Sequence, residues 1–406
     1  AETSGKNAIV VSATADVDQA VSDVVRSAFG HAGQKCSAAS LAIVDASLYD
    51  ASPFLRQLAD AVGALRVGSS TDPASQVGPI VGPFTESLQR ALTALDPGES
   101  WLIEPRCLDS HRRLWSPGVR IGVQPGSWAH QTEWFGPVLG VMRAGSLDQA
   151  LRWQNAVAYG LTAGLQSLDP AEHRHWVDTV EAGNLYVNRP TTGALVGRQP
   201  FGGWKRSSVG PTAKTGGPNY LLALRRWRDP DEVGVDETMA DFRRWWECHF
   251  GRTTELAGLA SESNQLRYRP FGPGVVLRVD DDVADEALAK ALGAAALTGT
   301  TVRVSSARPR PGRRSLPTGT AFTVESSEAL ALSLASSAGA RLRILGRAEP
   351  DVLAAAAEHA VTVVDEPVCS HGRIELVRWL REQVVTRSLH RYGNVVYSPL
   401  DGTDKV

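Results

Sequence analysis

Cysteine is scarce in this sequence, and so are long apolar runs and any excess of charge. The 406 residues include four cysteines, Cys36, Cys107, Cys248 and Cys369, which are too few and too scattered for a disulfide framework. We therefore expect a reducing compartment and predict a cytoplasmic protein. No apolar run approaches the ~18 residues of a membrane helix and no signal peptide is visible, so no transmembrane segment is expected. The net charge of −2 gives no reason to expect a nucleic-acid partner.

Two kinds of binding motif are also missing. No Gly-x-Gly-x-x-Gly pattern follows any predicted strand in the second half of the chain, which argues against a nucleotide site there. The pairs Cys248-His249 and Cys369-x-His371 lack the spacing of a tetrahedral metal site, so we assign no metal. The chain opens with Ala1 rather than methionine, which we interpret as the start of a fragment of something longer.

The hydrophobic residues, 43% of the chain, are arranged in short apolar strands that alternate with amphipathic helices. This alternation predicts an α/β fold with a largely parallel sheet. A strand is expected at Ala8–Ser12, followed by a helix from Asp16 to Phe29 with Asp16 as its N-cap. Further helices are expected at Ser47–Val62 and Leu147–Tyr159. A second βαβ series runs from about Val275 to Val364.

The stretch Phe29–Ser37 (FGHAGQKCS) places Cys36 after a glycine-rich turn. A thiolate is a strong nucleophile near neutral pH, and an exposed turn lets a substrate reach it. The backbone N–H of Cys36 is then a candidate donor to an oxyanion. The alternative is a buried structural cysteine, which is what most lone cysteines are.

Two carboxylates and a loop complete the candidate chemistry. Glu2 is either an ordinary surface acid or a base that activates water. Glu133, in TEWFGPVLG, lies either in a surface turn or against a cofactor hydroxyl. Thr191–Gly217 is rich in Gly, Thr, Ser and Pro, and is either a linker or a loop whose backbone N–H groups hold an anion. These residues indicate a cysteine nucleophile with a carboxylate and an anion site, but they do not indicate hydride transfer.

The same motifs resemble those of the aldehyde dehydrogenase superfamily. Glu2 with Gly5-Lys6 resembles the general-base motif, and Cys36 in GQKCS, 34 residues later, resembles the nucleophile motif at the family's spacing. Glu133 and Phe135 in EWFGPV resemble the motif that grips the nicotinamide ribose, which implies NAD as cofactor. PFGGWKRSSVG at Pro200–Gly210 resembles the C-terminal signature.

ETSGKN, FGHAGQKCSAAS, TTGALVGRQPFGG and GGPNY narrow the resemblance to the L-glutamate γ-semialdehyde dehydrogenase module of the bifunctional proline utilization A family. That resemblance implies that Ser37, Gly193 and Ala194 hold the substrate α-carboxylate and that Phe201 lines the aldehyde pocket. Three parts are implied: an aldehyde dehydrogenase catalytic domain at 1–190, an anchor loop and connecting segment at 191–235, and a second Rossmann-like α/β domain without a nucleotide motif at 236–406.

The implied reaction is NAD-dependent oxidation of L-glutamate γ-semialdehyde to L-glutamate in proline catabolism. Cys36 would form a thiohemiacetal and then a thioester, and Glu2 would activate the water that hydrolyses the thioester. The dinucleotide-binding region and a proline dehydrogenase domain with FAD would precede Glu2, so the NAD site in this chain would be incomplete and the isolated chain inactive. Its partners would be the small aldehyde substrate and the missing N-terminal part of the polypeptide.

Two other functions stay open. The chain is alternatively a non-catalytic lid or assembly module with a vestigial dehydrogenase half, or an aldehyde dehydrogenase for another carboxylated aldehyde. The resemblance also raises a homodimer, with Val384–Tyr397 as a candidate for the strand flap that pairs the two copies.

Overall fold

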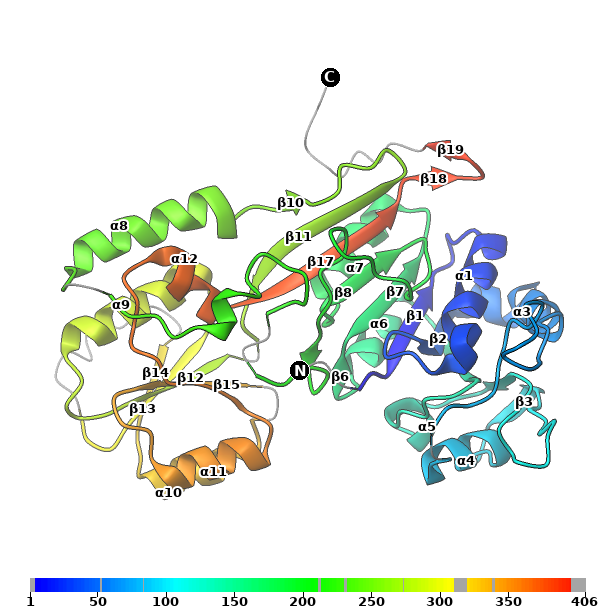
Figure 1. Cartoon of the computed structure of the whole chain (residues 1–406), viewed down its shortest axis with the longest axis horizontal. Helices are drawn as coiled ribbons and strands as arrows, with labels where there is room; N and C mark the ends of the chain where they lie inside the picture. The colour runs from blue at the N-terminus through cyan, green and yellow to red at the C-terminus, as the bar shows by residue number, and fades with distance from the viewer. Residues whose placement is uncertain are drawn as a thin grey trace. The chain divides into compact units, whose positions relative to one another are not determined.

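The computed structural model describes residues 4–51, 53–82, 84–210, 213–229, 232–272, 274–309, 320–337 and 340–395 (Figure 1). The chain divides into two compact units, each with its own hydrophobic cores. The first unit comprises the described parts of Thr3–Gln199, Ala257–Asn264 and Val385–Val406, and the second those of Pro200–Leu256 and Gln265–Val384. The domain bounds expected from the sequence, 1–190, 191–235 and 236–406, stay a prediction.

The first unit is built on a mixed sheet with the strand order β17-β8-β7-β1-β2-β5-β4-β3. Every pair from β8 to β4 is parallel, and β3 is antiparallel to β4. The bounds are β1 (Asn7–Val11), β2 (Ala39–Asp45), β3 (Ser100–Ile103), β4 (Gly118–Ile121), β5 (Val138–Ala144), β7 (Thr162–Gln166), β8 (Asn184–Val187) and β17 (Leu380–Ser388). A short strand, β6 (Tyr159–Gly160), precedes β7, and only the C-terminal part of β17 belongs to this unit.

Alternation along β1 explains why helices cover both faces of this sheet. Ala8 and Val10 pack into one core, whereas Ile9 and Val11 pack into the other. The helices α1 (Val17–Phe29) and α3 (Pro53–Gly63) contribute to the core of Ile9 and Val11. The opposite core receives α4 (Glu86–Thr93), α6 (Leu147–Asn155) and α7 (Pro170–Thr179). Two short helices, α2 (Ala46–Asp50) and α5 (Trp128–Gln131), complete the unit.

The α/β fold with a largely parallel sheet is confirmed, and so is the first strand–helix pair. The Asp16 carboxylate accepts a hydrogen bond from the backbone N–H of Gln19 at 3.2 Å, as expected of an N-cap. Two helix bounds were wrong. The helix expected at Ser47–Val62 is two helices, because Pro53 begins a new one. The helix expected at Leu147–Tyr159 ends at Asn155, and Tyr159 begins strand β6.

The second unit contains a five-stranded parallel sheet in the order β14-β13-β12-β15-β16. Its strands are β12 (Val275–Val279), β13 (Val302–Ser306), β14 (Thr320–Val324), β15 (Arg341–Leu345) and β16 (Thr362–Val364). The helices α8 (Val235–Trp245) and α9 (Asp285–Thr298) pack on one face, and α10 (Ser327–Leu334) and α11 (Pro350–Glu358) pack on the other. This is the doubly wound, Rossmann-like arrangement that the second βαβ series predicts.

The turn after β12 is acidic, at the point where a dinucleotide-binding sheet holds a pyrophosphate. Asp280, Asp281 and Asp282 follow the strand, and α9 has Asp285 and Glu286 in its first turn. Such a turn repels a phosphate group, because the helix N-terminus is already matched by its own carboxylates. The second unit therefore has the sheet of a dinucleotide-binding fold with a turn that is unsuited to the ligand.

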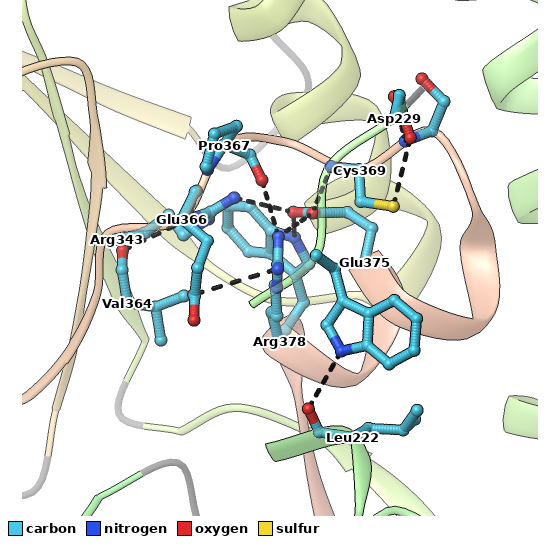
Figure 2. A network of polar contacts seen from close by, with 12 residues as sticks. Leu222, Asp229, Arg343, Val364, Glu366, Pro367, Cys369, Glu375 and Arg378 are labelled. Carbon is cyan, nitrogen blue, oxygen red and sulfur yellow. Dashed lines mark hydrogen bonds and ion pairs between the residues drawn. The ribbon is translucent and has the colours of Figure 1, made fainter. Parts of the chain in front are cut away.

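A buried carboxylate organises the end of the second unit (Figure 2). Glu375, in α12 (Gly372–Glu375), accepts hydrogen bonds from Arg378 at 2.8 Å and from the Trp379 indole at 3.0 Å. Its partners also include the Arg343 guanidinium at 3.3 Å and the backbone N–H of Cys369 at 3.0 Å. The segment between α11 and β17 is thereby tied to strand β15, the neighbour of the central strand β12.

The remaining short strands are β9 (Trp204–Lys205), β10 (Thr254–Glu255), which pairs antiparallel with β11 (Glu262–Pro270), and the hairpin β18 (His390–Arg391) and β19 (Asn394–Val395). Within the part of the chain that the structure describes, no helix combines the length and apolarity needed to cross a membrane.

Candidate active site

The turn that carries Cys36 is held in an unusual backbone conformation. His31, Ala32 and Gly33 have φ values of 54°, 55° and 69°, so three successive residues are left-handed. For the two that are not glycine, this conformation costs roughly 1–2 kcal/mol each. Strain of this kind persists only where the surrounding structure imposes it, and it is frequent at functional sites. The turn delivers Cys36 to an exposed position, while the next residue, Ser37, is only 7% exposed.

Close backbone packing joins this turn to the EWFGPV motif. A Cβ added to Gly33 would lie 2.2 Å from the carbonyl oxygen of Gly136, so a side chain at this position would collide with the motif. Both the positive φ at position 33 and this close contact therefore require glycine. In the same motif Phe135 also has a positive φ, 54°, and its side chain is exposed.

The segment that follows Glu2 contacts both of these motifs. The backbone N–H of Gly5 donates to the Glu133 carboxylate at 2.9 Å, and a Cβ on Gly5 would lie 2.8 Å from the carbonyl oxygen of Cys36. The Lys6 ammonium nitrogen lies 3.5 Å from the centroid of a Trp134 ring. Burial, and then the charge of Arg120, hold the pKa of Lys6 well below its ordinary value.

Side chains of α1 form hydrogen bonds with the residues at the start of the anchor loop. The Gln19 amide donates to the carbonyl oxygen of Asn188 at 2.8 Å, and the backbone N–H of Thr191 donates to the Ser27 hydroxyl at 3.0 Å. Gly193 then takes a positive φ of 88°. The helix that leads into the cysteine turn therefore also positions the start of the anchor loop.

A hollow of about 760 Å³ opens beside these segments, and we call it the entrance hollow. It is lined by Arg26, Gly30, His31, Ala32, Gln34, Lys35, Ser70, Gln76, Gly78, Pro79, Val81, Phe135, Thr192 and Gly193. Two of the expected site residues, Phe135 from the cofactor motif and Gly193 from the anchor loop, thus face one space. Arg26 and Lys35 give the lining two cationic side chains, and none of the lining residues is acidic.

Other expected site residues lie elsewhere. Glu2 is outside the residues that the structure describes. Ala194 is half-buried in the loop after Gly193. Phe201 belongs to the second unit, where its backbone exchanges hydrogen bonds of 3.0 and 2.9 Å with Thr215. The roles assigned to these residues stay predictions. Among the described residues, no group of His, Cys, Asp or Glu has the arrangement of a metal site.

The sequence did not reveal several residues that shape this site. Asn7, Thr162 and Thr191 are buried polar residues whose side chains bond the backbone of residues 36–38. Their contacts join segments 29 to 154 residues apart in sequence, so no local pattern predicts them.

A smaller cavity of about 270 Å³ lies in the second unit, with Asn219, Trp227, Arg341 and Glu382 among its lining residues. None of the expected site residues lines it.

Comparison with known proteins identifies the family of the first part of the chain, which contains Cys36, Glu133 and Phe135. Residues 1–228 match the model of the aldehyde dehydrogenase family, so the chain belongs to that family. It is 36% identical over 228 residues to 1-pyrroline-5-carboxylate dehydrogenase of Bacillus subtilis, a match that covers 55% of this chain and 42% of that protein. The chain therefore spans less than half the length of this curated relative.

Similarity to solved structures extends into the second unit. Proline utilization A from Corynebacterium freiburgense is 42% identical, with a TM-score of 0.82 over 97% of this chain and 40% of that one. Proline utilization A from Bdellovibrio bacteriovorus is 37% identical, with a TM-score of 0.51 over 57% of this chain and 25% of that one. The fold over 97% of the chain, which includes most of the second unit, thus has a counterpart in a longer protein.

Proposed function

We propose that this chain is the catalytic and C-terminal part of an NAD-dependent L-glutamate γ-semialdehyde dehydrogenase, within a longer bifunctional enzyme of proline catabolism. The observation that carries the proposal is the convergence of three segments in the first unit. The turn of Cys36, the Glu133–Phe135 motif and the start of the anchor loop meet at one hollow. Similarity to proline utilization A over 97% of the chain supports this role.

Cys36 would act as the nucleophile. Its thiolate attacks the aldehyde carbon, and the resulting oxyanion of the thiohemiacetal is stabilised by N–H donors, of which the Cys36 backbone N–H is a candidate. NAD, when bound, supplies the acceptor for the hydride that leaves this carbon. Glu2 then removes a proton from the water that attacks the thioester, which releases L-glutamate and regenerates the thiol.

The residues present fit one part of an NAD site. The Glu133 carboxylate is oriented by the N–H of Gly5, and the Phe135 ring is 44% exposed at the entrance hollow. These two side chains would hold the nicotinamide ribose. The rest of the dinucleotide site, and a flavin-dependent proline dehydrogenase domain, would be supplied by an N-terminal part of the longer polypeptide.

Recognition of a carboxylated substrate is supported by the charge of the entrance hollow. Arg26 and Lys35 line it without an opposing acid among the lining residues, and a Cβ added to Gly193 would meet no atom of the described residues within 4 Å, its chain neighbours aside. A substrate carboxylate would be held by the backbone of Gly193 and Ala194 and by Ser37. The four cysteines form no disulfide, which suits the cytoplasmic location that we propose.

The test is to measure NADH formed from L-glutamate γ-semialdehyde by the 406-residue chain and by a polypeptide that adds a dinucleotide-binding region before Ala1. We expect no NADH from the shorter chain. The longer polypeptide should be active, and Cys36→Ser should lower its kcat by about 10³-fold or more. NADH from the shorter chain would refute its inactivity, and none from either would favour the non-catalytic assembly role.

Substrate class is tested in the active polypeptide with Ser37→Ala and Gly193→Val. Both changes should reduce kcat/KM for the carboxylated aldehyde at least tenfold more than for an uncharged aldehyde of similar length. Equal losses for the two aldehydes would count against carboxylate recognition at these residues.

A further inference from the structure

The peptide groups on both sides of Ser37 are held by side chains from other strands and loops. The Asn7 amide donates to the carbonyl oxygen of Cys36 at 2.7 Å and to that of Ala38 at 2.9 Å. The Thr191 hydroxyl donates to the carbonyl oxygen of Ser37 at 2.9 Å. Three consecutive carbonyl groups, from Cys36 to Ala38, thus have side-chain donors.

The Asn7 amide has no freedom to turn. Its Oδ1 accepts the backbone N–H of Thr162 at 3.0 Å, so both of its N–H donors and its acceptor are engaged. The side chain is 3% exposed, and a Cβ on Gly5 would lie 2.9 Å from its amide atoms. The Asn7 side chain therefore bridges β7 and the cysteine turn in a tightly packed environment.

Fixing these carbonyl groups fixes the N–H groups that follow them. A peptide group is planar, and its N–H points opposite to its C=O. With the Cys36 carbonyl directed to Asn7, the N–H of Ser37 is directed away from Asn7. With the Ser37 carbonyl directed to Thr191, the plane of the next peptide group is fixed as well. The two planes together set the relation between the Cys36 thiol and the Ser37 N–H.

We propose that Asn7 and Thr191 are positioning residues, which hold the Cys36 thiol and the Ser37 N–H in the relation that a carboxylated aldehyde requires. The inference rests on the proposed function, because it assumes that the thiol attacks a substrate whose carboxylate is bound near Ser37. A purely structural role would stabilise the first unit without changing how Cys36 discriminates between charged and neutral reagents.

The 406-residue chain carries its own controls for a test that needs no NAD. Cys36 and Cys107 are both exposed, whereas Cys369 is buried. Each cysteine is alkylated with iodoacetate or iodoacetamide, and the rates are read peptide by peptide by mass spectrometry. The ratio of the two rates at Cys36, relative to that at Cys107, reports recognition of a carboxylate beside the thiol.

Asn7→Ala and Thr191→Val remove the donors without adding charge, and Thr191→Ser keeps the hydroxyl. We expect the iodoacetate-to-iodoacetamide ratio at Cys36 to fall about tenfold in Asn7→Ala, which corresponds to ~1.4 kcal/mol, because the N–H donor beside the thiol is no longer held in place for the carboxylate. It should fall severalfold in Thr191→Val and be retained in Thr191→Ser. The ratio at Cys107 should not change in any variant.

Two outcomes separate the inference from the proposed function. If the iodoacetate-to-iodoacetamide rate ratio at wild-type Cys36 is no higher than the same ratio at Cys107, the hypothesis of carboxylate recognition fails. Positioning is then judged by the iodoacetamide rate alone, which must change in Thr191→Val and recover in Thr191→Ser. If both the ratio and the iodoacetamide rate stay unchanged in the variants, the inference is overturned. Thr191→Val and Thr191→Ser decide the matter even if Asn7→Ala does not fold.

Discussion

Asp23 shows how burial on α1 changes the chemistry of a single carboxyl group. It is 8% exposed, and the Gln166 amide donates to it at 3.0 Å. Burial raises the pKa of Asp23 to about 6, against the smaller opposing influences of Gln166 and of the cations Arg189 and Arg26. The folded protein therefore binds a proton here between about pH 4 and pH 6, where the unfolded chain has released it.

The sign of the pH dependence follows from that difference. Asp23 lowers the free energy of unfolding as the pH rises from about 4 to 6, and the loss persists above pH 6. We expect Asp23→Asn to raise the free energy of unfolding by roughly 1–3 kcal/mol at pH 7.5, and to add nothing at pH 4. Urea unfolding at both pH values measures this change in the free energy of unfolding. The control is Asp18→Asn, which removes an exposed carboxylate of the same helix. An equal increase in the free energy of unfolding at both pH values would contradict a raised pKa of Asp23.

At the scale of residues, the sequence predicted local roles well and long-range contacts poorly. Asp16 was identified as an N-cap because capping depends on neighbours three residues away. The bond between Asn7 and the Cys36 carbonyl depends on the register of β1 with β2, which no local pattern encodes. Cys36 and Glu133 were found through motifs. Asn7 and Thr191 also lie in quoted motifs, ETSGKN and TTGALVGRQPFGG, but the motifs assign no role to either side chain.

At the scale of elements, β15 departs from an ordinary buried strand. Its sequence RLRIL places Arg341 and Arg343 inside the second unit, where each is 1% exposed. The Arg343 guanidinium is compensated by Glu375 (Figure 2), whose pKa is held low, although burial opposes this, by Arg343 and Arg378. Glu375 therefore stabilises the fold above about pH 4, and this stabilisation is lost as the pH falls through its depressed pKa.

Replacing this carboxylate tests the network. Glu375→Gln keeps the shape but leaves Arg343 and Arg378 without their buried anion, so we expect it to lower the free energy of unfolding of the second unit by about 3–5 kcal/mol. Hydrogen exchange of residues 341–345 and 372–382 reports the loss locally. Glu366→Gln is the matched control, because its ion pair with Arg378 is longer, 3.9 Å, and should contribute less than about 1 kcal/mol. Equal effects of the two changes would contradict the role of Glu375.

Element prediction succeeded where the apolar pattern was strong. Strand β1 and the second βαβ series, which begins with β12, were expected near their observed positions because apolar side chains fill their strands. In contrast, β11 (ESNQLRYRP) was not expected, because polar and charged residues dominate it even though it lies in a sheet. Pairing with neighbouring strands, rather than its own hydrophobicity, makes this segment a strand.

At the scale of the whole molecule, the hairpin β18–β19 contacts the start of the first helix. In the hairpin β18–β19, Tyr392 and Gly393 have φ values of 48° and 83°, as a type I′ turn requires. The Arg391 guanidinium and the Tyr392 hydroxyl donate to Asp16 at 2.9 and 2.7 Å. Val384–Tyr397 was expected to pair two copies of the chain. Arg391 and Tyr392 of this segment contact the N-cap of α1 in the same chain, and the pairing of two copies stays a prediction.

Removing this contact should loosen the start of α1. We expect the pair of changes Arg391→Ala and Tyr392→Phe to speed amide exchange severalfold in Val17–Ala20, more at low salt than at high salt. Arg143→Ala is the control, since it breaks an exposed ion pair with Asp50 in the same unit, far from these amides in sequence. Unchanged exchange at Val17–Ala20 in the double variant would show that the hairpin does not support the helix.

The strand order has a consequence for synthesis of the chain on the ribosome. Strand β8 ends at Val187, but its neighbour in the sheet, β17, ends at Ser388. At about 5–20 residues per second, roughly 10–40 s pass between the two. Throughout that interval the backbone of β8 (NLYV) is an open edge, able to pair with another nascent chain. The folding yield of this protein should thus depend on how quickly the residues between Val187 and Ser388 are translated.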